Sequence, residues 1–222
     1  MKKRTQLANR SLPNYFKGEE IMNMVTHIVG GGLGIIVLLL CILRSYENPL
    51  ALVGSCIYGG SMIALYTISS VYHGMRPCTG KKVMQILDHC TIYYLIVGTY
   101  TVILLSAMVP AYPWIGWGLL TVQWALAALA TVFTAIDLKN YQVFSMICYV
   151  GMGWGIILFI PQTIQVLTPM GFGLLLAGGI VYTIGAVLYG IGSKIHWIHS
   201  IFHIFVVLGS ILQFVAIYGF AL

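Results

Sequence analysis

Long apolar runs separated by short polar stretches dominate this chain. The run from Ile21 to Leu43 and the stretch from Asn48 to Met75 contain no Asp, Glu, Lys or Arg. At about 1.5 Å of rise per helical residue, each is long enough to cross a hydrocarbon layer of ~30 Å. These two segments predict the first two transmembrane helices.

The next apolar segment, from Val83 to Ile136, is about twice as long as one membrane-spanning helix. Asp88 is its one charged residue, and Pro110 and Pro113 lie near its middle. Proline removes a helical hydrogen bond and clashes with the preceding turn. The segment therefore predicts two helices.

The stretch from Asn140 to Ser193 repeats this design without any charge, and Pro161 and Pro169 flank a predicted turn. A last apolar segment, from Ile195 to Leu222, adds one further helix. The pattern as a whole predicts seven transmembrane helices.

The composition excludes a water-soluble globular domain. Of the 222 residues, 59% are hydrophobic and 7% are charged, whereas soluble domains carry about 25% charged residues. We therefore predict an all-α, polytopic membrane protein that consists of an N-terminal segment, residues 1–20, and a seven-helix transmembrane domain, residues 21–222.

The net charge of +6 follows the predicted topology. Basic residues concentrate in cytoplasmic loops, and only Arg44 lies on the side opposite to the others. This bias predicts a cytoplasmic N-terminus and, with seven spans, an external C-terminus. Membrane lipids with anionic headgroups are the expected partners of the basic side chains, and nucleic acid binding has no support. The ten residues on the predicted cytoplasmic side are Lys2, Lys3, Arg4, Arg10, Lys17, Arg76, Lys81, Lys82, Lys139 and Lys194.

Glycines at a spacing of four residues indicate close helix packing in lipid. Gly30 and Gly34 have this spacing in the first predicted span, and Gly151 and Gly155 have it in the fifth.

Several polar side chains within the predicted spans share one depth, near the cytoplasmic ends. Asp88 lies inside the third span, where an ionisable group costs about 2.5–3.5 kcal/mol on insertion scales. His73 closes the second span, and His199 and His203 lie in the first turns of the seventh. Ser69 and His73 are four residues apart, as are His199 and His203, so each pair shares a helix face. These residues can converge on one centre.

Three neutral imidazoles are a typical ligand set for zinc that keeps a position for water. Zinc lowers the pKa of that water toward ~7, and Asp88 could orient or deprotonate it while Ser69 donates a hydrogen bond. Hydrolysis of a carbonyl-containing bond in a lipid-accessible substrate would suit such a site. The spacing of the histidines alone fits a structural role equally well. Asp88 favours the metal, because a carboxylate at this depth needs a cation or a histidinium.

The other histidines have different expected roles. His196 is expected at the membrane boundary, where amphipathic rings gather. His89 points about 100° away from Asp88 around the helix and should face another helix. The role of His27 stays open.

Four segments resemble the hemolysin III family, the bacterial branch of the progestin and adiponectin receptor superfamily, which is related to alkaline ceramidases. The resemblance runs from about Gly18 to the C-terminus. It implies seven spans with an internal N-terminus and a zinc ion held on the cytoplasmic side by His73, His199 and His203. It also implies a nearby serine and aspartate, matching Ser69 and Asp88, and leaves the roles of Glu20, Asn23 and His27 open. The matching segments are Glu20-x-x-Asn23-x-x-Thr26-His27, Ser69-Ser70-Val71-Tyr72-His73, Asp88 and His199-Ser-Ile-Phe-His203.

Two functions are compatible with this resemblance, both in the bacterial cell membrane. The first is zinc-dependent hydrolysis of a lipid amide or ester, by analogy with ceramidases. The second is a non-enzymatic membrane-homeostasis regulator or a pore-forming cytolysin with structural zinc, although the polar residues do not line any span from end to end as a pore requires. Retinal is nearly excluded, because Lys194 lies in a predicted loop and no span offers a lysine for a Schiff base. Haem is disfavoured, because His199 and His203 on one helix face cannot be opposite axial ligands, although histidines from different helices could be.

Overall fold

Helices make up nearly all of the computed structural model, which describes residues 5–192 and 195–222. Six of these helical segments are long and apolar enough to cross a membrane, and one of the six is bent. The bounds are Lys17–Ser45 (α1), Pro49–Gly74 (α2), Thr79–Ile103 (α3), Val109–Ala111 (α4), Pro113–Ile136 (α5), Gln142–Gly153 (α6), Ile160–Gly192 (α7) and Ile198–Phe220 (α8), with short 3-10 or π turns at Leu7–Asn9 (η1), Leu104–Met108 (η2) and Gly155–Phe159 (η3).

The first helix begins at Lys17 rather than at Ile21, where the charge-free run starts. The Glu19 carboxylate accepts a hydrogen bond of 2.7 Å from the backbone N–H of Phe16, which caps the first turn. Negative charge in a first turn also stabilises the positive end of the helix dipole. A hydropathy pattern cannot predict this first helical turn, because the side chains that stabilise it are polar.

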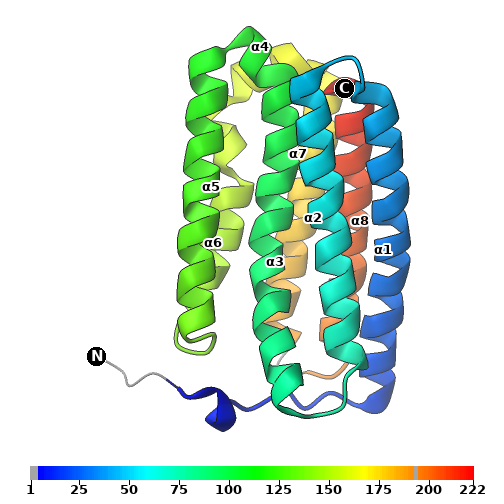
Figure 1. Ribbon diagram of the computed structural model, residues 1–222, viewed down its shortest axis with the longest axis vertical. Helices are drawn as coiled ribbons and strands as arrows, with labels where there is room; N and C mark the ends of the chain where they lie inside the picture. Colours follow the sequence, from blue (N-terminus) through cyan, green and yellow to red (C-terminus); the bar gives the residue numbers. More distant parts are fainter. Residues whose placement is uncertain (1–4, 193–194) are drawn as a thin grey trace.

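The prolines mark the reversals of the chain. Helix α3 continues through η2 and α4, and α5 begins at Pro113. In the bent segment, Gln142–Gly192, the helical backbone is broken at Thr168, with φ 63° and ψ 164°. The Thr168 hydroxyl accepts a hydrogen bond of 3.4 Å from the N–H of Gly171 and caps the helix that restarts at Pro169. In this segment, α6 runs beside α5, and α7 returns in the opposite direction beside α8 (Figure 1).

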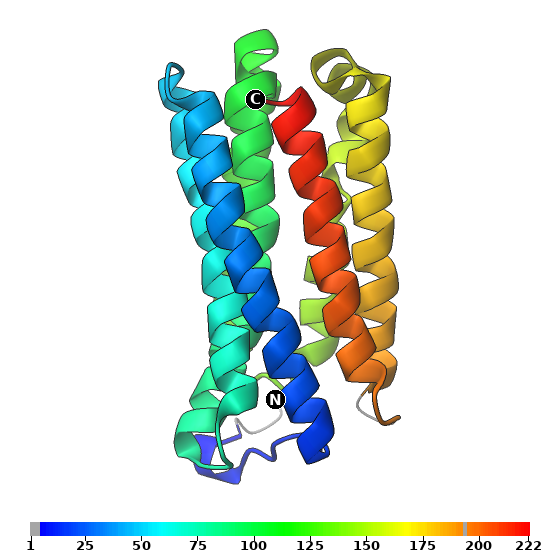
Figure 2. The ribbon, with the colours of Figure 1, turned by 90° about the vertical axis from the view of Figure 1, so that its right-hand side faces the viewer.

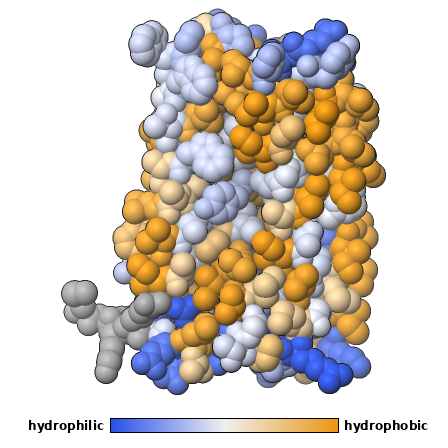
Figure 3. Space-filling model, in the orientation of Figure 1, coloured by the Kyte–Doolittle hydropathy of each residue, from blue (hydrophilic) through white to orange (hydrophobic). Residues whose placement is uncertain are grey.

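The long helices run side by side, with α8 between α1 and α7 (Figure 2). On the face shown in Figure 3, apolar side chains cover much of the bundle, with less hydrophobic residues among them, and the most hydrophilic residues gather at its two ends. Large apolar side chains such as Ile28, Ile35 and Leu43 are exposed on this surface. A surface of this kind is stable in lipid rather than in water, so the chain is a multi-pass membrane protein.

Basic residues lie at the end of the bundle that holds the start of α1 and the connections between α2 and α3 and between α5 and α6 (Figure 1). Arg44 lies at the opposite end, with its guanidinium carbon 5.5 Å from the centre of the Tyr218 ring. Lys2, Lys3, Arg4 and Lys194 fall outside the described residues.

Three of the four glycines in the two pairs make the expected close contacts. A Cβ on Gly30 would lie 2.5 Å from the Tyr66 ring, and a Cβ on Gly34 would lie 3.2 Å from the backbone nitrogen of Ile63, so α1 and α2 approach closely there. In the second pair, the expectation holds for Gly155, where a Cβ would lie 2.8 Å from Nε2 of Gln123, and is wrong for Gly151, where a Cβ would meet nothing within 4 Å. Gly151 is exposed on the outer face of α6.

Candidate metal centre

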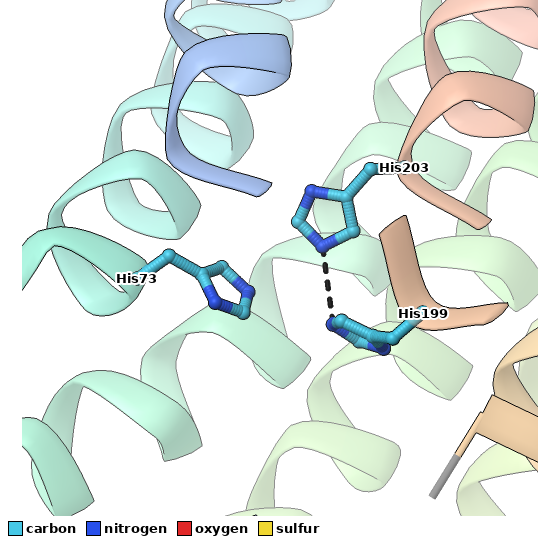
Figure 4. Close-up of side chains that lie close together, drawn as sticks. All are labelled: His73, His199 and His203. Atoms are coloured by element: carbon cyan, nitrogen blue, oxygen red, sulfur yellow. Dashed lines mark hydrogen bonds between the residues drawn. The ribbon is translucent and has the colours of Figure 1, made fainter. Parts of the chain in front are cut away.

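Three histidines from two helices meet inside one end of the bundle. His73 lies in the last turn of α2, and His199 and His203 lie in the first two turns of α8. Each offers a ring nitrogen, and these three atoms lie within 4.8 Å of one another. All three side chains are buried, and their rings face one another (Figure 4).

The ring nitrogens fit a metal ion. The Nε2 atoms of His199 and His203 are 3.1 Å apart, close to the ~3.3 Å that separates two imidazole nitrogens around tetrahedral zinc. The Nε2 of His73 is buried and has no hydrogen-bond partner among the described residues. An unpaired buried polar atom costs about 1–3 kcal/mol, and a bound cation would remove that cost. Imidazole suits zinc as well as copper, iron and nickel.

The other ring nitrogen of His73 is held from α1. Its Nδ1 lies 2.6 Å from Oε2 of Glu20 and 3.4 Å from Nδ2 of Asn23. The second oxygen of Glu20 accepts a hydrogen bond of 2.5 Å from Nζ of Lys81, which also donates to the carbonyl of Met75 at 3.0 Å. Lys81, predicted as a loop residue, lies in the first turn of α3 and is 3% exposed.

A fourth histidine lies against the triad. The His27 ring stacks on the His203 ring with centroids 3.8 Å apart, and its edge contacts Tyr66. Both ring nitrogens of His27 are buried, and within the described part of the chain neither has a hydrogen-bond partner. His27 therefore places two further ring nitrogens without hydrogen-bond partners among the described residues beside the three histidines.

The two remaining histidines point elsewhere. His89 hydrogen-bonds through Nε2 to the hydroxyl of Tyr189 on α7, at 2.8 Å, which confirms that it faces another helix. His196 is half exposed, 3.2 Å from a Glu19 oxygen, and stacks on Phe16. Neither joins the triad.

Asp88 and Ser69 line a cavity that adjoins the triad and is also lined by His27 and His203. Its volume is about 160 Å³, and its remaining lining is mostly apolar side chains of α3, α6, α7 and α8, among them Ile92, Leu95, Leu175 and Val206. Among the described residues, the basic group paired with Asp88 is His89, whose Nδ1 lies 3.9 Å from Oδ2. Asp88 therefore faces the cavity without a direct bond to the three histidines.

The segment before α1 covers this end of the bundle. The Tyr15 ring stacks on the His199 ring with centroids 4.8 Å apart and an interplanar angle of 19°. Upstream, the N–H of Thr5 donates to the Asp137 carboxylate at 2.7 Å, and Arg10 donates to the carbonyl of Ile136 at 2.9 Å. The sequence pattern gave no indication of this cover, because nothing in its spacing links residues 5–16 to α5 or α8.

These features define a class of protein: a multi-pass helical membrane protein with a buried histidine triad at one end of its bundle. Residues 16–214 match the Haemolysin-III related family, and the chain belongs to that family. The predicted family resemblance is thereby confirmed.

Relatives in bacteria and animals are similar along most of the chain. Hemolysin-3 of Bacillus cereus is 37% identical over 209 residues, which cover 93% of this chain and 94% of the relative. The Hemolysin-3 homolog of Bacillus subtilis (strain 168) is 36% identical over 88% of this chain and 91% of its own. The Monocyte to macrophage differentiation factor of Homo sapiens is 27% identical over 74% of this chain and 68% of its own.

Proposed function

We propose that the protein is a zinc-dependent hydrolase of a lipid amide or ester. The observation that carries this proposal is the shared cavity: Asp88, Ser69 and His203 line one largely apolar space beside the triad. Such a lining suits an acyl chain, and the polar groups at its histidine end suit the bond to be cleaved.

The histidines His73, His199 and His203 would hold the ion. When bound, zinc supplies a Lewis acid and a water molecule of lowered pKa. The Asp88 carboxylate accepts a proton from the attacking water and returns it to the leaving group. The Ser69 hydroxyl donates a hydrogen bond to the oxygen that gains negative charge, and the apolar lining excludes bulk water from the reacting bond.

The proposal includes a topology. The 51-residue segment Gln142–Gly192 reverses direction at Thr168 and counts as two spans, which makes seven. The basic residues at the triad end support a cytoplasmic position of that end and of the N-terminus in the bacterial cell. Labelling of single cysteines in intact cells tests this: Lys139→Cys should resist an impermeant maleimide, and Glu47→Cys should react.

Zinc content and lipid hydrolysis, measured on the same detergent-solubilised preparations, test the chemistry. Wild type should contain about one zinc per chain and release fatty acid from a ceramide or a lysophospholipid. Asp88→Asn should keep the zinc and lose at least ~100-fold in rate, as removal of a general base does, whereas His203→Ala should lose both. Fatty acid release that survives in the Asp88→Asn and His203→Ala variants would refute the proposal.

The name of the bacterial relatives supports a second candidate, a cytolysin or membrane regulator in which zinc holds α2 and α8 together. Reconstituted liposomes separate the two candidates. Release of an encapsulated dye by wild type and His203→Ala alike, without lipid cleavage, would favour the cytolysin.

A further inference from the structure

Two neighbouring carboxylates in the first turn of α1 have different partners near the metal centre. Glu20 contacts His73 of α2 and Lys81 of α3. Glu19 accepts a hydrogen bond from the backbone N–H of Trp197, directly before α8, and lies 3.2 Å from His196. Helix α1 supplies none of the three histidines, yet its first turn contacts α2 and the residues that directly precede α8.

We propose that Glu20 is a positioning residue of the metal centre: it fixes the His73 ring so that Nε2 faces the site as a free ligand atom. This inference rests on the metal site proposed above. It assigns a role to the Glu20-x-x-Asn23 segment, which the sequence left open.

The hydrogen-bond chemistry carries the assignment. An ionised carboxylate can only accept hydrogen bonds, so the 2.6 Å contact places the imidazole proton of His73 on Nδ1. The competing Asn23 contact is longer, at 3.4 Å. With its proton on Nδ1, the ring presents an unprotonated Nε2, the atom that is buried without a partner among the described residues. Metal-bound histidines are commonly held by a carboxylate at their second nitrogen in this way.

Lys81 keeps Glu20 in its role. Its ammonium group contacts the other carboxylate oxygen at 2.5 Å and is itself held by the Met75 carbonyl. A lysine that is 3% exposed requires such partners, and its contact holds the Glu20 carboxylate in place against the His73 ring. The contacts form a chain from α3 through α1 to the ligand on α2.

Alternatively, Glu20 and Lys81 are only an ion pair that joins α1 to α3. Measurement of zinc affinity distinguishes this structural role from the positioning role. Zinc affinity of purified protein is measured by competition with a chromophoric chelator, and the visible spectrum of the cobalt(II) form reports ligand geometry. Glu20→Gln should weaken zinc binding by roughly 10–100-fold and alter the cobalt spectrum. Glu19→Gln removes the same charge from the same turn but contacts none of the three histidines, so its zinc affinity should stay within about threefold of wild type.

The outcomes distinguish this inference from the proposed function. If wild type binds zinc and Glu20→Gln binds it equally well, or if both glutamine variants lose the same affinity, the positioning role is wrong and the metal site stands. If wild type binds no zinc, both fail.

Lys81→Met provides a second measurement should Glu20→Gln not fold. Lys81 donates no hydrogen bond to a triad histidine and reaches His73 through Glu20, so Lys81→Met should weaken zinc binding severalfold, and adding it to Glu20→Gln should weaken binding no further. Unchanged zinc affinity in a folded Lys81→Met variant would overturn the inference.

Discussion

The Asp137 carboxylate should stabilise the folded protein in a pH-dependent way, and Asp137→Asn tests this. The side chain is 2% exposed in the connection between α5 and α6. Burial raises its pKa, but hydrogen bonds from the backbone N–H groups of Thr5 and Asn140 outweigh burial and lower the pKa to about 2, from an ordinary value of 3.8. At about 1.4 kcal/mol per pKa unit, this difference corresponds to a stabilisation on the order of 2 kcal/mol.

The sign follows from the lowered pKa in the folded state. Ionised Asp137 stabilises the fold fully above pH ~4, the pKa of the unfolded chain, and this contribution is lost as the pH falls toward 2. Asp137→Asn should therefore unfold more easily than wild type at pH 7, and the difference should shrink as the pH is lowered through that window.

Unfolding in detergent, followed by tryptophan fluorescence between pH 7 and pH 2.5, measures the effect. Glu47→Gln, which removes a carboxylate at the opposite end of the bundle, serves as the control and should not reproduce the pH dependence. An equal stability of wild type and Asp137→Asn at pH 7, or a difference that stays constant down to pH 2.5, would refute the reasoning.

Three further outcomes follow from the core and the site. Chelation by EDTA should lower the unfolding temperature of wild type and leave that of His203→Ala unchanged, since only wild type has metal to lose; an equal response would argue against the site. His27→Phe should keep one zinc per chain by elemental analysis, because it removes unpaired nitrogens and no member of the triad; loss of zinc would make His27 a ligand. Gly54→Ala should cost about 1–3 kcal/mol in the free energy of unfolding, because its Cβ would lie 2.7 Å from the Cα of Val102, whereas Gly60→Ala, with nothing within 4 Å, should be neutral or stabilising by detergent unfolding; equal effects would contradict the packing.

Hydropathy alone predicted most of the helices, because lipid requires long uncharged runs and their lengths are set by the bilayer. It misplaced the start of α1, since Glu19 and Glu20 look like loop residues until their hydrogen bonds are seen. Lys81 was assigned to a loop for the same reason: a charge near a helix start has the same hydropathy whether it is solvated or buried against a carboxylate.

The candidate site was predictable where it depended on periodicity. His199 and His203 share a helix face by spacing alone, and His73 shares their depth by the span count. The Glu20 contact with His73 and the stacking of Tyr15 on His199 could not be predicted in this way. They depend on how α1 packs against α2 and α8, and a period along one helix carries no information about its partner.

The division of the triad between α2 and α8 orders its assembly during biosynthesis. His73 enters the membrane early in translation, while α8 emerges from the ribosome after all the other described helices. A chain that stops before α8 holds a single triad histidine and cannot close the site. Binding of a metal ion by all three histidines therefore requires that α8, the last of the described helices, has been synthesised.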